Sequence, residues 1–425
     1  MEDTTVPGAE ALAPLIHAVL GDDLPVEVKL WDGSRLGPPD GPASIVMRSP
    51  KAVRRILYSP NEVGFGRAYI LGDIEIEGDA LAAIRLVARA APDELRIGTR
   101  TLARTLLASV RLGVLGRPLP RPAEEARLGG SRHSKARDSA AIAHHYDVGN
   151  DFYRLILGGS MTYSCARFAD PSDSLETAQA AKYDLICRKL GLRPGMRLLD
   201  VGCGWGGMVM HAATHYGVTG VGITLSHQQH ELACKRVAEA GLSDRVEIRL
   251  LDYRDVGSDG QRWDAISSIG MFEHVGQAQM TSYFRTLAAV LTPGGRFLNH
   301  AISTPNGAQF DRHSFTARYV FPDGELADVA AVASAMEAVD LEVRDVESLR
   351  EHYALTLRHW VDNLLANWDA AVALVGPVRA RIWKLYMLGA IVSFESNEVG
   401  IHQVLGVKPE PDGTSGMPLT RREMV

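Results

Sequence analysis

The sequence predicts an α/β protein built on a doubly wound, mostly parallel sheet, and two observations support this prediction. From residue 139 onward, short apolar segments alternate with helix-like stretches at intervals of about 20–30 residues, which is typical of βαβ units. The first of these segments ends in a glycine-rich turn, a feature common where a parallel sheet binds its ligand. We therefore expect a Rossmann-like sheet of seven strands over residues 139–409, preceded by a small α+β domain.

Seven short runs are the strand candidates. The seven runs cover residues 196–202, 218–224, 245–252, 263–270, 295–303, 341–349 and 399–407. Between the last two lies a long helical stretch that contains Trp360, Leu364, Leu365 and Trp368. Glu273 and His300 lie at the ends of the fourth and fifth strands, where open α/β sheets bind ligands at the carboxyl edge.

Residues 1–115 have a different character and are expected to form a separate small domain. Strand candidates at 25–33 and 43–49 precede a short helix at 50–60, and the glycine- and aromatic-rich segment 63–79 is expected to turn tightly. Residues 116–138 are crowded with proline, glycine and charge, so we place an exposed linker there. The last residues, 410–425, are expected to form a flexible tail.

The composition is that of an ordinary globular protein. Of the 425 residues, 46% are hydrophobic and 23% are charged, which excludes wholesale disorder, collagen-like repeats and a coiled-coil rod. No apolar run reaches the length of about 18 residues needed to span a bilayer, and the first residues do not resemble a secretory signal. The four cysteines form no CxxC pair. We expect a reduced, cytoplasmic protein that binds neither metal nor nucleic acid.

The net charge of −6 is unevenly distributed. Between Arg96 and Arg137 ten basic residues stand against two acidic ones, a local excess of eight positive charges. Within this region, residues 99–116 place Arg100, Arg104 and Arg111 on one helical face. The opposite face carries Leu106, Leu107, Val110 and Val114. A basic amphipathic helix of this kind binds anionic phospholipid, although an ordinary surface helix with a solvated arginine face explains the pattern equally well.

The strongest local motif is LDVGCGWG at 199–206. A dinucleotide site needs an acidic residue at the end of the second strand, but that strand ends in Gly222, Ile223 and Thr224. A phosphate-binding loop needs a following GKS or GKT, which is missing. An S-adenosylmethionine (SAM) site fits better, because a sulfonium cation favours an acidic, glycine-lined turn. The alternatives are a purely structural turn and, disfavoured, an NAD(P)-dependent oxidoreductase.

Residues 139–407 resemble the cyclopropane-fatty-acid synthase family of SAM-dependent methyltransferases, which includes the mycolic acid cyclopropane synthases. The resemblance covers about two thirds of the chain and depends on several strings in a fixed order. These strings are HHYDVGNDFY (144–153), MTYSCARF (161–168), LLDVGCGWGG (198–207), GITLSHQQ (222–229), IGMFEHVG (269–276), LNHAIS (298–303) and HYALTLRHW (352–360). It implies a class I methyltransferase domain over 139–409, with an insertion that covers the acyl site.

The resemblance also implies which residues contact SAM. They are Tyr163, Ser164, Asp200, Gly202, Gly204, Trp205, Gly206, Thr224, Leu225, Gln229, Asp252 and Tyr253. In the family pattern Tyr163 and Ser164 contact the methionine moiety, whereas Asp252 and Tyr253 lie near the adenine. The alternative for Thr224, Gln229 and Asp252 is a helix-capping role, because such residues often precede helices.

The family alkylates the cis double bond of a lipid chain, so the alkene attacks the sulfonium methyl and no protein nucleophile is needed. A bound bicarbonate ion then serves as the base that closes the ring. The resemblance places its holders at Glu273, His300 and Tyr353, with Cys165 and Ile302 contributing through the backbone. The alternatives are a core histidine for His300, a charge at a helix N-terminus for Glu273, and packing for Tyr353. His274 is a rival for the role of Glu273.

One position departs from the family pattern. Relatives often carry Phe-Arg with a cysteine four residues earlier, whereas here Phe394 is followed by Glu395 and preceded by Ala390. A covalent cysteine mechanism at that position is excluded. The product is then either a cyclopropane or, after a hydride shift, a methylene branch that a separate reductase converts to a methyl branch. The implied partners are an unsaturated phospholipid, the inner membrane surface and, in a homodimer, a second copy of the chain.

Overall fold

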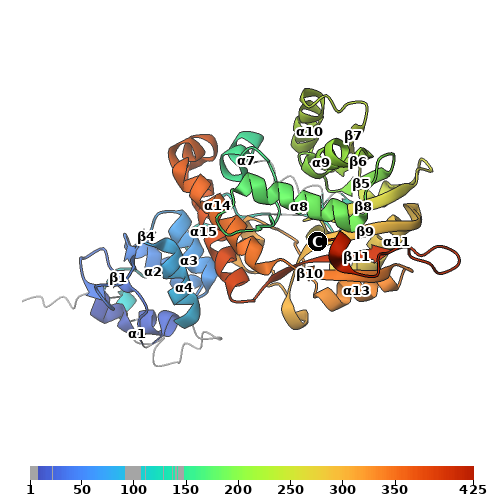
Figure 1. Ribbon diagram of the computed structural model, residues 1–425. Coiled ribbons are helices and arrows are strands. Elements are labelled where there is room, and N and C mark those ends of the chain that lie inside the picture. The colour runs from blue at the N-terminus through green and yellow to red at the C-terminus, as the bar shows by residue number, and fades with distance from the viewer. Residues whose placement is uncertain are drawn as a thin grey trace, which may run out of the picture. The chain divides into compact units, whose positions relative to one another are not determined.

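The computed structural model describes most of the chain as two compact units (Figure 1). The described residues are 8–21, 23–90, 107–110, 112–127, 129–135, 137–138, 141 and 148–425. Unit 1 comprises the described residues up to Ala126 together with His313–Val320 and Val375–Val392. Unit 2 comprises Arg127–Arg312, Phe321–Leu374 and Ser393–Val425. Unit 1 therefore includes two segments from the region in which sequence analysis places the methyltransferase domain.

Unit 1 is a four-stranded sheet with short helices. Its strands, in the order β2-β1-β3-β4, are β1 (Glu27–Lys29), β2 (Arg35–Leu36), β3 (Ala43–Met47) and β4 (Ile74–Gly78). Its helices are α1 (Gly8–Leu20), α2 (Pro50–Tyr58), α3 (Glu62–Ile70), α4 (Ala80–Ala90) and α12 (Phe315–Tyr319). Ser49 caps α2 by accepting a hydrogen bond from the Lys51 amide, and a proline follows at the first helical position. These observations confirm the small α+β domain.

The segment 63–79, expected to turn tightly, instead forms helix α3 and strand β4. Its glycines permit close packing rather than a turn: a Cβ at Gly66 would lie 2.4 Å from the ring of Phe315 in α12. A second contact in unit 1 centres on the buried carboxylate of Glu125, which accepts hydrogen bonds from Arg67 and Arg318 at 2.7 Å each. Tyr319 donates a third at 3.2 Å. These bonds attach the segment 313–320 to unit 1.

Unit 2 contains a seven-stranded sheet in the order β10-β11-β9-β8-β5-β6-β7. The strands are β5 (Arg197–Val201), β6 (Thr219–Thr224), β7 (Val246–Leu250), β8 (Trp263–Ile269), β9 (Leu291–Ser303), β10 (Glu342–Ser348) and β11 (Gly400–Val407). All seven predicted strands are present, and β11 is antiparallel to both of its neighbours. The predicted Rossmann-like, mostly parallel sheet is confirmed.

Helices cover both faces of this sheet, as a doubly wound fold requires. They are α8 (Leu175–Leu190), α9 (Gly207–Tyr216), α10 (His227–Glu239), α11 (Met280–Val290) and α13 (Val329–Glu337). Helices α7 (Asn150–Leu157) and α14 (Arg350–Ala366) pack against each other. Neighbouring residues of β5 enter opposite cores because side chains alternate along a strand. Leu198 packs with α8 and α9, whereas Leu199 packs with α11 and α13.

The connections of β5 create a crevice. The chain continues from β5 to β6 on one side, and β8 pairs with β5 on the other. At such a topological switch point the loops after the two strands diverge, and ligands bind there at the carboxyl edge. The glycine-rich turn follows β5 directly and is therefore placed at the crevice.

The C-terminal residues differ from their expectation. Residues 410–425 were predicted to be flexible, but Met424 is buried in the core cluster that contains Leu198. Arg421 forms an ion pair with Asp345 of β10 at 2.6 Å. Apolar burial and an ion pair together hold this segment against the sheet. The polar composition of the segment did not predict either contact. Helix α15 (Trp368–Glu395) is broken at Gly376, where φ is 80° and a proline follows.

Candidate active site

The glycine-rich turn leads from β5 into helix α9 through residues with positive φ. Gly202 has φ of 76°, and a Cβ there would lie 2.8 Å from the side chain of Met271. Only glycine fits this combination of backbone conformation and close approach. The amides of Gly202 and Cys203 both donate to the Ile223 carbonyl, which fixes the turn against β6. The sequence therefore provides an open, rigid wall at the switch point.

A cavity of about 890 Å³, part of it open to solvent, lies against this turn. Ten of the twelve residues expected to contact SAM line it: Tyr163, Ser164, Asp200, Gly202, Gly204, Trp205, Thr224, Leu225, Gln229 and Tyr253. The other two, Gly206 and Asp252, are not among the lining residues. The motifs that sequence analysis singled out are thus brought together around one cavity.

The segment before α8 is held against the cavity by aromatic and polar contacts. The Tyr163 ring stacks on Trp360 of α14, with centroids 5.2 Å apart. The Ser164 carbonyl accepts a hydrogen bond from Gln179 at 2.9 Å. Across the cavity wall, Trp205 Nε1 donates to Asn150 Oδ1 at 2.7 Å. These contacts fix Tyr163, Ser164 and Trp205 before any ligand binds.

Thr224 and Gln229 form a buried pair at the end of β6. The Thr224 hydroxyl donates to Gln229 Oε1 at 2.8 Å, and the Ser226 amide donates to the same hydroxyl at 3.2 Å. The N-cap of α10 is Ser226, whose hydroxyl accepts from the Gln229 amide. Thr224 is thus not the residue that caps this helix. The pair leaves the Gln229 side-chain amino group as a hydrogen-bond donor beside the cavity.

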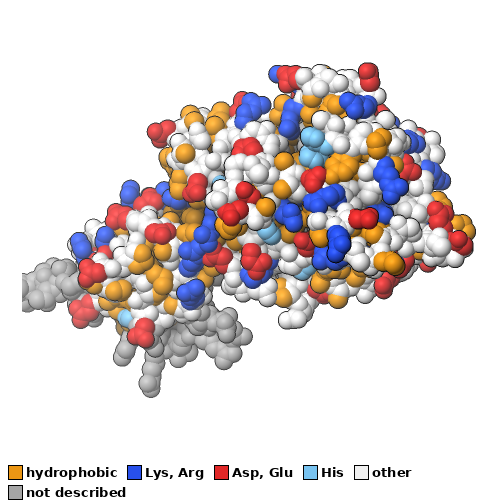
Figure 2. All heavy atoms as spheres, in the orientation of Figure 1, with side chains coloured by type: hydrophobic (Ala, Val, Ile, Leu, Met, Phe, Trp, Pro, Cys, Tyr) orange, Lys and Arg blue, Asp and Glu red, His pale blue; other side chains and the backbone are white. Residues whose placement is uncertain are grey.

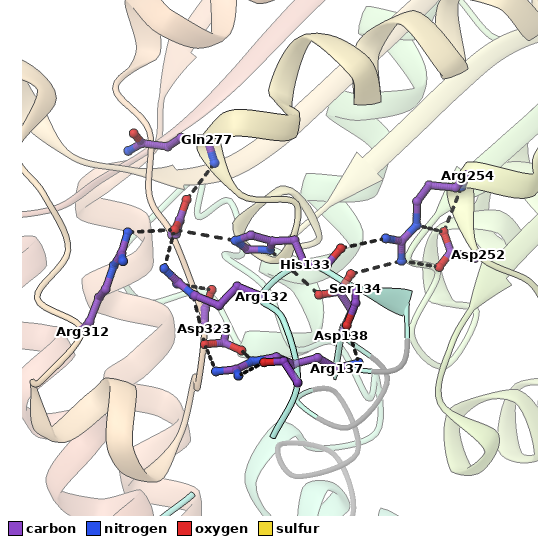
Figure 3. Close-up of polar contacts among 12 residues, drawn as sticks. Arg132, His133, Ser134, Arg137, Asp138, Asp252, Arg254, Gln277, Arg312 and Asp323 are labelled. Atoms are coloured by element: carbon purple, nitrogen blue, oxygen red, sulfur yellow. Dashed lines mark hydrogen bonds and ion pairs between the residues drawn. The ribbon is translucent and has the colours of Figure 1, made fainter. Parts of the chain in front are cut away.

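Asp252 belongs to a different network, shown in Figure 3. Its carboxylate accepts hydrogen bonds from Arg254 Nε at 2.8 Å and Nη2 at 2.6 Å, and Arg254 also donates to Asp138 at 3.1 Å. Burial alone would raise the pKa of Asp252, but the bonds from Arg254 hold it below its ordinary value. Asp252 also caps the turn Tyr253–Asp255. A contact between Asp252 and adenine remains a prediction.

The same network anchors the segment 130–138 to unit 2 (Figure 3). Arg132 and Arg137 both bind Asp323, and Arg132 lies 3.0 Å from Glu325. The Glu325 amide in turn donates to the Glu273 carbonyl at 3.0 Å. The part of the expected linker that belongs to unit 2 is therefore connected, through Glu325, to the backbone of Glu273.

Glu273 is buried and directly contacts Ile302. Its Oε1 accepts a hydrogen bond from the Ile302 amide at 2.8 Å. Its Oε2 has no hydrogen-bond partner within the described part of the chain. Burial raises the pKa of Glu273 to about 7, against the lowering effect of the bond from Ile302. The carboxyl group can thus hold or release a proton near neutral pH.

His300 lies two residues before Ile302 on β9 and is completely buried. The Gln403 side-chain amide donates to its Nδ1 at 3.1 Å, so the proton of the neutral ring resides on Nε2. Among the described residues this Nε2 has no acceptor. Burial is the main cause that lowers the pKa of His300 well below its ordinary value, and the positive charge of Lys182 adds to it. His300 therefore offers a neutral N–H donor.

Cys165 and Tyr353 are connected through Leu349. The Cys165 thiol lies 3.6 Å from the Leu349 carbonyl, which also accepts the Tyr353 amide at 3.1 Å. The Tyr353 ring packs on Phe394 at 4.6 Å between centroids. Burial raises the pKa of the Cys165 thiol far above neutral, so the thiol stays protonated. This fits a backbone role better than a nucleophilic one.

The five residues implied in catalysis do not line the cavity, but direct sequence neighbours of two of them do. Ser164 lines the cavity beside Cys165, and His274 lines it beside Glu273. The pKa of His274 is lowered to about 4 by burial, so its ring is neutral. Sequence reasoning missed Lys182 of α8, which also lines the cavity. Its only sequence signal is a lysine on the apolar side of a helix, which rarely draws attention because most helical lysines are solvated.

The described residues contain no group of three or more His, Cys, Asp or Glu side chains able to hold a metal ion. Across the same residues, no helix combines the length and apolar character needed to cross a membrane.

On the face of unit 2 that Figure 2 shows, basic and acidic side chains are interspersed with apolar ones.

Comparison with known proteins assigns the family. The family model described as mycolic acid cyclopropane synthetase matches residues 133–404. A Mycobacterium tuberculosis protein named "Probable fatty acid methyltransferase" is 43% identical over 93% of this chain and 94% of its own length. The tuberculostearic acid methyltransferase UfaA1 of the same organism is 32% identical over 95% of this chain and 93% of its own.

Among solved structures, the mycolic acid cyclopropane synthase CmaA1 complexed with SAH and CTAB matches with a TM-score of 0.59 and 33% identity. The match covers 63% of this chain and 97% of that one. The oxidoreductase alternative is thereby set aside. The chain belongs to the mycolic acid cyclopropane synthetase family and is a SAM-dependent methyltransferase of the cyclopropane synthase type, which acts on fatty acyl chains.

Proposed function

We propose that this enzyme transfers a one-carbon unit from SAM to the cis double bond of an unsaturated acyl chain in a phospholipid, giving a cyclopropane fatty acid. The observation that carries the proposal is the buried polar pair of Glu273 and His300. Within the described residues, Glu273 Oε2 and His300 Nε2 both lack a partner. Unsatisfied buried polar atoms are costly, and a bound ion is one group that can satisfy them.

The chemistry requires little from the protein at the reacting carbon. The alkene supplies the electron pair that attacks the sulfonium methyl, and the resulting carbocation must be shielded from water. The protonated Cys165 thiol provides no competing nucleophile. Glu273 and His300 are both buried, so they can support proton removal in a place that bulk water does not reach.

Bicarbonate fits the groups that the chain presents. A protonated Glu273 and the His300 Nε2–H are donors suited to an oxyanion, because burial raises the pKa of Glu273 to about 7. Glu273, His300 and Tyr353 would hold it through side chains, and Cys165 and Ile302 through the backbone. The Ile302 amide is bonded to Glu273 Oε1, and this bond would position the carboxyl group that contacts the ion. When bound, bicarbonate supplies the base that accepts the proton released during ring closure.

A methylene-branched product is the second candidate, and Glu395 favours it. Glu395 forms an ion pair with Arg358 of α14, and its backbone carbonyl accepts from Arg350 at 3.0 Å. An acidic side chain therefore stands near the Tyr353–Phe394 contact, where the family pattern has arginine. A different charge here can change whether a hydride shift moves the cation before the added methyl group loses its proton. The product would then need a separate reductase to become a methyl branch.

The proposal places the enzyme on the inner membrane surface in the cytoplasm, acting there as a homodimer. Half of the predicted basic helix 99–116 lies outside the described residues, and Arg100, Arg104, Arg111 and Leu106 are among those not described. Leu107 and Val110 are both 62% exposed, whereas Val114 is buried. Exposed apolar side chains within a basic segment support insertion at a lipid surface.

Product analysis tests the reaction. A host that makes unsaturated phospholipids should express the chain with a SAM pool carrying a trideuterated methyl group. Both candidate products retain two deuterium atoms on the added carbon, so NMR of the purified fatty acid must distinguish a ring from an exocyclic methylene. A ring supports the main proposal and a methylene supports the second candidate. Retention of three deuterium atoms would contradict both.

Vesicle binding tests the location. Wild type should sediment with anionic phosphatidylglycerol vesicles, and Leu107→Asn combined with Val110→Asn should weaken this binding about tenfold. The double variant should keep SAM binding, which serves as the control for folding. Equal sedimentation of both proteins would contradict the membrane role of this segment.

A further inference from the structure

Lys182 is a buried cation in the wall of the cofactor cavity. It lies near the middle of α8, its side chain has no exposed surface, and it lines the cavity together with Ser164 and Asp200. Its Nζ donates to Ser164 Oγ at 2.9 Å and lies 4.0 Å from the centroid of the Tyr183 ring. Lys182 is not among the site residues that the family resemblance implies.

The hydrogen-bonding capacity of Lys182 is mostly unused. An ammonium group has three N–H donors, but in the described part of the chain Ser164 Oγ is its one hydrogen-bond acceptor and no carboxylate lies within ion-pair distance. The other fully buried lysine of the same helix, Lys189, lies 2.9 Å from Asp345 and also pairs with Glu347. A buried charge without a contacting counter-charge is costly, and Asp200 acts on Lys182 only from beyond ion-pair distance. Lys182 is therefore arranged for an anion that makes direct contact and comes from outside the chain.

The ligand of this cavity carries such an anion. SAM has a carboxylate and an ammonium group on its methionine moiety, and the cavity wall presents Lys182 and Asp200 as groups of opposite charge. We infer that Lys182 binds the methionine carboxylate of SAM directly, an inference that depends on the assignment of this cavity to SAM. Ser164 then contacts both Lys182 and the methionine moiety of SAM.

Several titratable groups from neighbouring elements act on Lys182. Asp200 of β5 stabilises its charged form, whereas His300 of β9 and His211 of α9 have their own pKa values lowered by it. The Cys165 thiol also interacts with it electrostatically. Burial outweighs the favourable interactions and lowers the pKa of Lys182 from 10.5 to about 7. A ligand carboxylate opposes this effect, so SAM binding should be accompanied by proton uptake at pH 7.5.

Calorimetry of wild type with SAM and with decarboxylated SAM tests the inference. Decarboxylated SAM keeps the sulfonium, the adenosine and the amine but lacks the carboxylate. Wild type should bind SAM about 10- to 100-fold more tightly, the range expected for a charge-assisted hydrogen bond. Titrations in buffers of different ionisation enthalpy should show proton uptake with SAM and none with the analogue.

Lys182→Met keeps the length and apolar stem of the side chain but removes the charge. The variant should lose the preference for SAM over decarboxylated SAM and should also lose the proton uptake, while its affinity for the analogue stays within about threefold of wild type. Lys189→Met is the matched control, because it removes a buried lysine of α8 that does not line the cavity. It should retain both the preference and the proton uptake.

The outcomes separate the inference from its premise. A Lys182→Met protein that still prefers SAM overturns the role of the lysine. If Lys182→Met keeps the preference for SAM but its turnover no longer depends on added bicarbonate, the inference is also overturned. Lys182 would then be assigned to the binding of bicarbonate. If wild type binds neither SAM nor decarboxylated SAM, the assignment of the cavity to SAM is overturned. The assignment is also overturned if Leu225→Trp, which fills the cavity, leaves the affinity for both ligands unchanged. The preference of wild type for SAM over decarboxylated SAM needs no variant, and equal affinity for the two ligands would overturn the inference even if Lys182→Met does not fold.

Discussion

Replacing Glu273 by glutamine isolates the ionisation of the buried carboxyl group. Glutamine keeps an oxygen that can accept the Ile302 amide, which now lies 2.8 Å from Glu273 Oε1. It replaces the other oxygen with an amino group that can neither take up nor release a proton. Because Glu273 does not line the cofactor cavity, SAM should bind within twofold of wild type. Turnover should fall by about 10²- to 10⁴-fold, the usual contribution of a positioned acid or base.

The same variant has a predictable effect on stability. Burial raises the pKa of Glu273 from 4.5 to about 7, so between these values the folded protein holds a proton that the unfolded chain has released. The free energy of unfolding of wild type therefore decreases as the pH rises through this window, by about 1.4 kcal/mol per pKa unit. Glutamine lacks this penalty. The variant should gain about 2 kcal/mol relative to wild type between pH 5.5 and pH 8.

Two assays measure these effects. Transfer of a labelled methyl group from SAM to vesicles of unsaturated phospholipid gives turnover, and urea unfolding at each pH gives the free energy. The control is Glu176→Gln, which changes an exposed glutamate of α8 and should alter neither quantity. Unchanged turnover would remove Glu273 from the reaction. A stability difference that does not depend on pH would show that its carboxyl group is ionised in the folded protein.

Three further variants test other parts of the structure. Gly202→Ala forces a Cβ to within 2.8 Å of Met271 at a positive φ, so calorimetry should show SAM affinity reduced at least tenfold, and unchanged affinity would contradict the rigid turn. Arg67→Met leaves the buried Glu125 without one of its partners and should lower the free energy of unfolding of unit 1 by about 3 kcal/mol in urea titrations, without affecting SAM binding. Cys165→Ala should keep turnover within about tenfold, because the thiol is protonated; complete loss in a folded protein would assign a role to the sulfur.

Sequence periodicity was sufficient to place the strands of unit 2. The run 341–349 became β10 (Glu342–Ser348), and 399–407 became β11 (Gly400–Val407). Strand direction is different information. Nothing in the run 399–407 indicates that it pairs antiparallel with β9, since direction depends on the path by which the chain returns to the sheet.

Domain membership was harder to predict than secondary structure. Residues 313–320 and 375–392 belong to unit 1 although they come from the C-terminal part of the chain. An amphipathic helix shows which side is apolar but not which core receives it. The decisive contacts, such as the Glu125 carboxylate with Arg318, join residues almost 200 positions apart. Such pairings are specified by tertiary packing, and no local sequence pattern predicts them.

The cofactor cavity was predictable to the extent that its residues follow strand ends. Gly202, Thr224 and Tyr253 come directly after β5, at the end of β6 and after β7, and a parallel sheet brings these positions to one edge. Lys182 reaches the same cavity from the middle of a helix, where neither a strand end nor a motif marks it. Its position becomes informative only when burial and the missing counter-charge are seen together.

The two buried lysines of α8 show why this distinction matters for function. Lys189 is seven residues after Lys182, on the same side of the helix, and two carboxylates already neutralise it. Helix α8 thus carries one buried lysine, Lys189, with carboxylates in contact and another, Lys182, without a carboxylate in contact. Stability alone accounts for the first, because a buried charge needs a partner. For the second, the missing partner must come from outside the chain, which makes the electrostatics of Lys182 a property of the complex with SAM rather than of the folded enzyme.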